Sequence, residues 1–234
     1  MHDTVNNQQA IPDPFADAQA VAEYAERPPR LVPGFDGMQR MARLLLAERV
    51  PDDARILVLG AGGGLELKAF AEAQRGWTFD GVDPAPAMLN LAKQTLGPLA
   101  ARVALQEGYI DDAPDEPFDG ATCLLTFHFL TRDTRRHTLA QIRRRLKPGA
   151  PFVLAHLSIA EGAAERARWL ARYSAYAVAS GVAEEKAIQA RTAIDRQLTI
   201  LAPEDDEAML REAGFKDVTL FYVGFTFRGW VGYA

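Results

Sequence analysis

The stretch ILVLGAGGGLELKAF, residues 56–70, combines an apolar run, a glycine-rich loop and the start of a helix. The apolar run leads directly into Gly60, and further glycines follow at 62–64. A continuous apolar run is typical of a strand buried on both faces. Glycines in such a turn let a ligand approach the backbone closely. The stretch therefore predicts a strand, a ligand-binding loop and a helix.

The glycine loop lacks the full dinucleotide fingerprint G-x-G-x-x-G. Its sixth position is Leu65, although Gly60, Gly62 and Gly64 precede it. A leucine at the helix start leaves less room for a pyrophosphate on the helix dipole. The loop therefore favours an uncharged or cationic nucleoside over a diphosphate, and a tight turn without a ligand is the alternative.

Asp83 is the candidate ligand for a ribose. It ends the next expected strand, residues 77–83, and lies 23 positions after Gly60. Folds of this kind place a carboxylate there on the ribose hydroxyls. Hydrogen bonds from a diol to an ionised acceptor are strong ones. The pair of loop and carboxylate therefore predicts a nucleoside site.

Strands and helices alternate on both sides of this stretch. Strands are expected at 55–60, 77–83, 102–108, 118–127 and 151–157, and helices at 36–50, 65–74, 84–96 and 133–146. Such alternation predicts an α/β fold with a doubly wound, Rossmann-like sheet. The right-handed crossover rule places the carboxyl ends of the strands, and any ligand, at one edge.

The pattern changes after residue 157. Residues 160–200 are rich in Ala, Glu and Arg and have a helical pattern throughout, which predicts a helical lid insertion. A short helix at 203–214 and closing strands at 217–224 and 225–234 follow. We expect these strands to form a hairpin at the sheet edge. The sheet would then have seven strands, mostly parallel with an antiparallel C-terminal strand.

Capping residues predict where two of the helices begin. Asp36 is the expected N-cap of the first helix, and Asp133 that of the helix before the fifth strand. In the first helix one face collects Met38, Met41, Leu44 and Leu45. Residues at this spacing are expected to pack against the sheet.

The composition argues against several classes of protein. The chain has 234 residues, 48% of them apolar, and a net charge of −5, which disfavours a nucleic-acid-binding face. Its single cysteine, Cys123, provides no disulfide framework and favours a cytoplasmic setting. There is no apolar run of about 18 residues that would span a membrane. The polar start lacks a signal-peptide core, so residues 1–34 are expected to form a tail and lead-in helix before a domain at 35–234.

Several motifs together carry a resemblance to a known family. They are VLGAGGG, GVDPAPAML, EGYIDDAP, FDGATCLLTFHFL, LKPGAPFVLAHLS and LREAGF. In this order and spacing they resemble the class I S-adenosylmethionine-dependent methyltransferases over most of residues 35–234. The resemblance implies that the domain binds S-adenosyl-L-methionine as cofactor and transfers its methyl group.

The resemblance also implies cofactor contacts at the matching positions. They are Gly60, Ala61 and Gly62 for the methionine and ribose, Asp83 for the ribose hydroxyls, Pro84, Met88, Tyr109 and Ile110 for the two faces of the adenine, Leu125 and Thr126 for the sulfonium and amino groups, with Phe35 and Leu65 beside them.

A narrower resemblance is to the carboxy-S-adenosylmethionine synthases, carried by RLVPGFDGM and AGF…GFTF. Those proteins use prephenate as carboxyl donor and make a carboxylated cofactor for tRNA wobble uridine. The resemblance implies that Arg191 holds the cofactor carboxylate, and a solvated arginine on a helix face is the alternative. The chain departs from the subgroup at Phe35, Leu124 and Tyr109, where polar cofactor contacts are lost.

His128 is the candidate catalytic base. Methyl transfer from a sulfonium depends mainly on orientation, but removing a proton from the acceptor can require a base. His128 follows the expected fourth strand in TFHFL, and packing between the flanking phenylalanines is the alternative. His156 is the second choice. The acids of 111–116 are spread along a loop and predict no metal site.

The sequence thus predicts a methyltransferase acting on a small-molecule acceptor. Two alternatives stay open: an enzyme like the carboxy-S-adenosylmethionine synthases, and a protein that binds the cofactor without catalysis. The arginines at 143–145 are expected on a solvated helix face, with RNA contact as the alternative. A homodimer is left open, and no membrane contact is expected.

Overall fold

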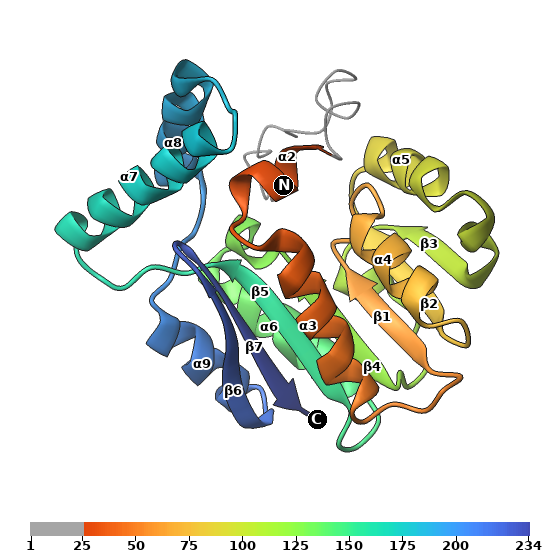
Figure 1. Cartoon of the computed structure of the whole chain (residues 1–234). Coiled ribbons are helices and arrows are strands. Elements are labelled where there is room, and N and C mark those ends of the chain that lie inside the picture. Colours follow the sequence, from red (N-terminus) through yellow and green to blue (C-terminus); the bar gives the residue numbers. More distant parts are fainter. Residues whose placement is uncertain (1–25) are drawn as a thin grey trace, which may run out of the picture.

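A seven-stranded sheet organises the computed structural model, which describes residues 26–234 (Figure 1). The strands are β1 Arg55–Leu59, β2 Thr78–Asp83, β3 Val103–Glu107, β4 Gly120–Leu124, β5 Pro151–Leu157, β6 Lys216–Gly224 and β7 Phe227–Tyr233. Their order in space is β3-β2-β1-β4-β5-β7-β6. Strands β1 to β5 pair in parallel, whereas β7 is antiparallel to both β5 and β6. The predicted sheet, with its closing hairpin at the edge, is confirmed.

Helices cover both faces of this sheet (Figure 1). The α-helices are α2 Arg27–Leu31, α3 Phe35–Ala47, α4 Leu65–Ala73, α5 Pro86–Leu96, α6 Arg132–Arg144, α7 Ala163–Ala179, α8 Glu184–Gln197 and α9 Pro203–Glu212. Short 3-10 helices are η2 Gly97–Arg102, η3 Ile110–Asp112 and η4 Phe127–Phe129. None of these helices, within residues 26–234, is long and apolar enough to cross a membrane.

Strand β1 explains why the opening stretch is apolar without alternation. Ile56 and Val58 belong to one buried cluster together with residues of α3 and α4. Leu57 and Leu59 point the other way, into a cluster with residues of α6 and α9. Successive side chains of a strand face opposite sides, so a strand between two helical layers needs apolar residues at every position.

Both predicted helix caps are wrong by two residues. The N-cap of α3 is Gly34 in the left-handed conformation (φ +68°), not Asp36. The N-cap of α6 is Thr131, whose hydroxyl accepts a hydrogen bond from the Thr134 amide, and Asp133 lies in the first turn. An aspartate in a first turn still favours the helix through the dipole, which is why the sequence did not separate these roles.

The buried face of α3 is also displaced from the predicted one. Met38 is buried, but Met41 and Leu44 are 36% and 49% exposed. Ala42 and Leu46 are fully buried in their place. The helix therefore faces the sheet with positions 35, 38, 42 and 46. The prediction selected the larger apolar side chains and so missed the buried Ala42.

Strand β4 is shorter than the expected 118–127. It ends at Leu124, and Leu125 has a positive φ of +62° that breaks the strand. The chain then enters η4. This early end places the residues after Leu124 in a loop above the sheet.

The region 160–200 forms two helices instead of one continuous helix. Helices α7 and α8 pack against each other and extend beyond the carboxyl ends of the parallel strands (Figure 1). Gly181, with φ +89°, lies in the turn between them. Helix α7 also contacts α2, the short helix where a lead-in helix was expected. Residues 1–25, which belong to the predicted tail, lie outside the range that the structure describes.

Candidate active site

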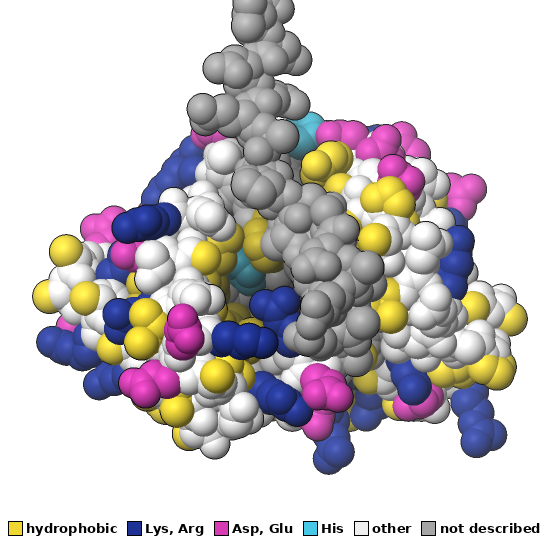
Figure 2. Space-filling model, turned by 90° about the horizontal axis from the view of Figure 1, so that it is seen from above, with side chains coloured by type: hydrophobic (Ala, Val, Ile, Leu, Met, Phe, Trp, Pro, Cys, Tyr) yellow, Lys and Arg dark blue, Asp and Glu magenta, His cyan; other side chains and the backbone are white. Residues whose placement is uncertain are grey.

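The carboxyl ends of β1, β2 and β4 bring the predicted site residues to one edge of the sheet. These strands are neighbours, with β1 in the centre. Figure 2 views the molecule from this side and shows a hollow with hydrophobic side chains inside it and lysine or arginine side chains nearby. In open α/β sheets this edge is where ligands bind.

The glycine loop is fixed by β2 and by the loop after β4. The amides of Gly60 and Ala61 both donate to the carbonyl of Val82, at 2.8 and 3.1 Å. Gly60 has φ +77°, and a Cβ there would lie 2.0 Å from Oγ1 of Thr126. Glycine is therefore required at this position by both conformation and space. The contact also brings Thr126 against the loop.

The last glycine of the loop is Gly64. It caps α4 with φ +81°, and a Cβ there would lie 2.9 Å from the Cα of Ala92 in α5. Gly64 therefore permits close packing of α4 on α5. Leu65 follows as the first residue of α4 and is partly buried against the core.

Asp83 connects three segments at the end of β2. Its Oδ2 accepts from the amide of Gly62 at 2.8 Å, and its Oδ1 accepts from the amide of Ala85 at 2.9 Å. Its carbonyl accepts from the amide of Gly108 at 3.1 Å. The side chain is only 9% exposed. Charge-assisted bonds of this kind fix the carboxylate directly beneath the glycine loop.

The four residues expected around an adenine divide into two kinds. Met88 and Ile110 are buried, at 1% and 3% exposure, and contribute to the protein core. Pro84 is exposed, and Tyr109 is 62% exposed. The carboxylate of Asp112 accepts from the Tyr109 amide at 2.8 Å and so fixes the turn. Of the four residues expected around the adenine, only Pro84 and Tyr109 are therefore open to solvent.

The end of β4 is conformationally strained. Leu125 has φ +62°, a region that costs a non-glycine residue about 1–3 kcal/mol. Its amide donates to the carbonyl of Ala155 at 2.6 Å, which holds the strained turn against β5. Strain of this kind is concentrated at ligand sites. Leu125 and Thr126 are both partly exposed beside the glycine loop.

His128 is buried beside this turn. It is 6% exposed, its Nδ1 accepts from the Leu157 amide at 3.4 Å, and its ring centroid lies 4.5 Å from that of Phe129. Burial lowers the pKa of His128 well below its ordinary value. The imidazole is therefore neutral, which is the form a base needs, but its proton affinity is low.

A buried polar cluster that the sequence did not reveal lies behind His128. Arg135 of α6 donates to the carbonyl of Phe127 at 3.0 Å and to the carboxylate of Asp206 in α9 at 2.9 Å. His156 is fully buried, with Nε2 at 3.5 Å from the same carboxylate. Burial lowers the pKa of His156 to about 3. His156 is therefore a neutral core residue. Arg135 was not predicted to be buried, because it lies among many polar residues of α6.

Glu66 is a second residue that sequence reasoning missed. It lies in the first turn of α4, 7% exposed, and the hydroxyl of Thr122 in β4 donates to its carboxyl group. Burial raises the pKa of Glu66 to about 8. The side chain is therefore largely protonated at neutral pH.

Arg191 and Phe35, two further predicted site residues, belong to helices α8 and α3. The side chain of Arg191 in α8 is partly buried and has no hydrogen bond or ion pair to a residue of 26–234. Phe35 begins α3 and is 7% exposed. The turn before it is held by the hydroxyl of Tyr222, which donates to the carbonyl of Pro33. Within residues 26–234, no group of three or more potential metal-ligating side chains occurs.

A domain match and a shared fold relate this chain to the methyltransferases. Residues 57–152 match the family model described as Methyltransferase domain. A solved O-methyltransferase family protein from Burkholderia thailandensis superposes with a TM-score of 0.69 at 16% identity, over 94% of this chain and 61% of its own. The chain thus spans less than two thirds of that structure. The domain match and the shared fold support a class I S-adenosylmethionine-dependent methyltransferase with S-adenosyl-L-methionine as cofactor.

Sequence relatives add a narrower resemblance. The carboxy-S-adenosyl-L-methionine synthase of Chromohalobacter salexigens is 27% identical over 221 residues, which cover 93% of this chain and 82% of that protein. The corresponding protein of Campylobacter lari is 23% identical over 217 residues, covering 93% of each chain. The chain therefore resembles the carboxy-S-adenosylmethionine synthases along nearly its whole length.

Proposed function

We propose that this protein transfers a methyl group from S-adenosyl-L-methionine to a small-molecule acceptor. The observation that carries the proposal is the carboxylate of Asp83 fixed beneath the glycine loop. The cofactor supplies an activated methyl group on its sulfonium sulfur. The chain supplies orientation, which can contribute about 7–11 kcal/mol to such a displacement.

The residues at this edge fit the cofactor chemically. Gly60, Ala61 and Gly62 present backbone at the end of β1 with no side chain larger than a methyl group. A carboxylate accepts several hydrogen bonds at its two oxygens, which suits Asp83 to a ribose diol. Pro84 and Tyr109 are exposed on either side of the position expected for the adenine.

The acceptor would lie on the β4 side of the cofactor. Leu125 and Thr126 are partly exposed there, and His128 lies just behind them. We assign His128 the role of accepting the acceptor's proton, in its neutral form. Helices α7 and α8 would cover this side as the lid that selects the acceptor. The net charge of −5 favours a small molecule over a nucleic acid.

A carboxy-S-adenosylmethionine synthase-like activity is the second candidate. Two observations favour it: the relatives bearing that name match along 93% of this chain, and the Arg191 guanidinium has no acidic partner within residues 26–234. Leu124, Tyr109 and Phe35 argue against it, because each lacks the polar group expected there. We therefore place methyl transfer first.

Mass spectrometry of the ligand released from the purified protein tests both candidates. S-adenosylmethionine or S-adenosylhomocysteine is the expected species. A ligand heavier than S-adenosylmethionine by one CO2 would replace the first candidate by the second. If no ligand co-purifies, titration calorimetry with S-adenosylhomocysteine tests whether the protein binds the nucleoside at all. The absence of binding would overturn both candidate functions.

Arg191→Lys separates the candidates further. A guanidinium pairs with a carboxylate through two parallel bonds that lysine cannot reproduce. If Arg191 binds an anion, the variant should weaken the carboxylated cofactor or an acidic acceptor and leave S-adenosylhomocysteine unchanged. A residue on a solvated face would change each affinity by less than about 0.5 kcal/mol.

A further inference from the structure

The loop after β3, residues 108–116, would carry the adenine side of the cofactor site. We call it the base-side loop. It is joined to the ribose side at its first residue, because the Gly108 amide donates to the Asp83 carbonyl at 3.1 Å. Its turn is closed by Asp112, which accepts from the Tyr109 amide at 2.8 Å. The position of this loop therefore decides where Tyr109 and its neighbours lie.

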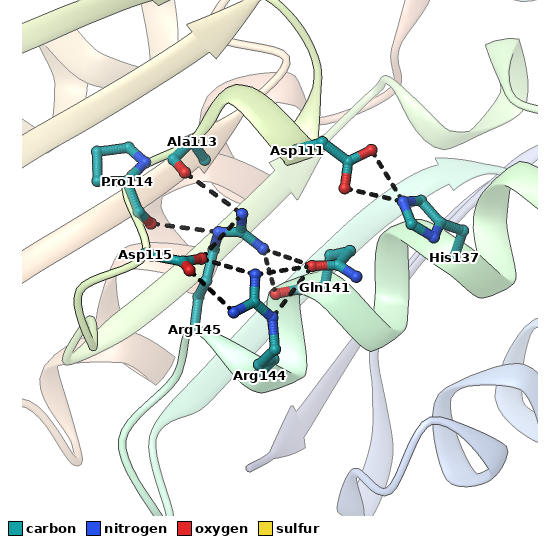
Figure 3. Close-up of polar contacts among 8 residues, drawn as sticks. All are labelled: Asp111, Ala113, Pro114, Asp115, His137, Gln141, Arg144 and Arg145. Carbon is teal, nitrogen blue, oxygen red and sulfur yellow. Dashed lines mark hydrogen bonds and ion pairs between the residues drawn. The ribbon is translucent and has the colours of Figure 1, made fainter.

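Arg145, at the C-terminal end of α6, holds the middle of the base-side loop (Figure 3). Its Nε donates to the carbonyl of Pro114 at 3.2 Å, and its Nη2 donates to the carbonyl of Ala113 at 3.3 Å. Its Nη1 donates to Oε1 of Gln141 at 2.8 Å. The side chain is only 3% exposed. A planar guanidinium can bridge several acceptors in this way, which a lysine cannot.

Two further contacts between α6 and this loop lie at the surface. Arg144 pairs with Asp115 at 2.6 Å, and Nε2 of His137 lies 2.9 Å from Asp111 (Figure 3). All four side chains are at least half exposed. Exposed pairs of this kind contribute about 0–1 kcal/mol. Arg145 is therefore the buried member of the contact and the one that fixes the backbone.

These contacts correct the expectation of a solvated face at Arg145, whereas the Arg144 side chain is exposed as expected. Arg145 is buried, and Arg144 is engaged with Asp115. The acids of the base-side loop pair with basic side chains of α6 and its C-cap.

We propose that Arg145 is a positioning residue for recognition of the adenine base. Its guanidinium binds the Ala113 and Pro114 carbonyls. It thereby holds the backbone around Tyr109 against the base. The inference rests on the proposed function, because it assumes that the nucleoside binds at this edge. It adds a determinant of base specificity that does not itself touch the ligand.

The test compares two ligands that differ only in the base. S-adenosylhomocysteine and S-inosylhomocysteine, in which the adenine amino group is replaced by a carbonyl oxygen, are titrated by calorimetry against the wild type, Arg145→Met and Arg145→Lys. Arg144→Met is the matched control, because Arg144 is the adjacent arginine and contacts the same loop through Asp115. We expect the wild type to prefer the adenine ligand.

Arg145→Met should weaken S-adenosylhomocysteine by roughly tenfold, equivalent to about 1.4 kcal/mol, and reduce the preference for adenine over hypoxanthine. Arg145→Lys should recover only part of the preference for adenine, and Arg144→Met should retain the whole preference. An unchanged preference in Arg145→Met, or an equal loss in Arg144→Met, would overturn the inference while leaving the proposed function intact. Failure of the wild type to bind either ligand would instead remove the proposed function.

Hydrogen exchange of the ligand-free proteins keeps the inference testable if Arg145→Met does not fold. The amides of Gly108 and Tyr109 should exchange faster in Arg145→Lys than in Arg144→Met, with β1 and β4 unchanged. Equal protection in the two variants would contradict a positioning role for Arg145.

Discussion

Asp83 holds the glycine loop in place and is also the residue proposed to bind the ribose. Its carboxylate accepts from the Gly62 and Ala85 amides, and its position at the end of β2 is the one expected to bind a ribose. Asp83→Asn removes the charge from these bonds and should weaken S-adenosylhomocysteine by about 10- to 100-fold, or 1.5–3 kcal/mol. Titration calorimetry measures the change.

Asp80→Asn is the control for the Asp83 prediction. Asp80 lies on the same strand but pairs with Arg55 at 2.7 Å, away from the glycine loop. This variant should lose stability and keep its affinity for the cofactor product. Unchanged binding in Asp83→Asn would remove Asp83 from the site.

Glu66 predicts a particular dependence of stability on pH. Burial raises its pKa in the folded protein to about 8, against 4.5 for a free glutamate. Between these values the folded protein keeps a proton that the unfolded chain has lost. Raising the pH through this window should therefore reduce the free energy of unfolding by up to about 1.4 kcal/mol per pH unit.

Glu66→Gln should abolish this component, since glutamine does not titrate. Denaturant unfolding at pH 5.5 and 7.5 would show the variant gaining stability relative to the wild type as the pH rises. Glu72→Gln, an exposed position on the same helix, should follow the wild type. Parallel pH profiles for Glu66→Gln and the wild type would contradict the raised pKa.

At the scale of single residues, the sequence predicted those whose role follows from local position. The position of Asp83 at the end of β2 was predictable, because a strand end after a glycine loop is a recurrent location for a carboxylate; its role in binding stays a prediction. Glu66, Arg135 and Arg145 were not predictable, because their burial depends on contacts with Thr122, Asp206 and the base-side loop. In the sequence they appear as ordinary charged residues of helices.

Among the elements, the glycine loop can be tested through a pair of glycines with nearly the same φ angle. Gly60 and Gly149 have φ values of +77° and +76°. A Cβ at Gly60 would meet Thr126 at 2.0 Å, whereas a Cβ at Gly149 would meet nothing within 4 Å. Gly149→Ala should therefore cost only the left-handed strain of about 1–2 kcal/mol, and Gly60→Ala should cost more and weaken cofactor binding.

Unfolding midpoints and calorimetry of both variants check this expectation. Gly60→Ala combined with Thr126→Gly should recover part of the stability, because it removes the clash and leaves the strain. Equal losses in Gly60→Ala and Gly149→Ala would mean that Thr126 does not constrain the loop.

The contact of α6 with α9 contains a buried and an exposed ion pair side by side. Arg135–Asp206 is at most 2% exposed on either side chain, and Arg132–Asp205 is 41% and 29% exposed. Arg135→Ala should destabilise the protein by about 3–5 kcal/mol, because it leaves Asp206 buried without its partner. Arg132→Ala should cost about 0–1 kcal/mol. Denaturant unfolding of the two variants compares them directly, and equal losses would contradict the difference in burial.

Element types were predictable, but several element ends were not. The strand–helix alternation follows from apolar runs and helical spacing, and the structure confirms it. The end of β4 depends on Leu125, whose left-handed conformation is held by the Ala155 carbonyl of a neighbouring strand. The turn at Gly181 was also missed, because a composition rich in Ala, Glu and Arg continues on both sides of it.

For the whole molecule, the choice of nucleotide cofactor is the simplest test. Leu65 replaces the third glycine of the dinucleotide fingerprint, so NAD should not bind measurably at 1 mM, where a ligand bound by about −4 kcal/mol would half-saturate the protein. S-adenosylhomocysteine at the same concentration should raise the unfolding temperature. A shift with NAD and none with S-adenosylhomocysteine would reverse the assignment.

The position of β7 has a consequence for how the chain is made. Strand β7 lies between β5 and β6, although both precede it in the sequence. On the ribosome, β5 and β6 therefore emerge before the strand that joins them. Until residues 227–233 follow, the nascent chain carries β5 as an open edge, the kind of surface that invites pairing with other chains. Completion of the sheet therefore waits for β7. A chaperone that acts during synthesis would find the open edge of β5 as its binding surface.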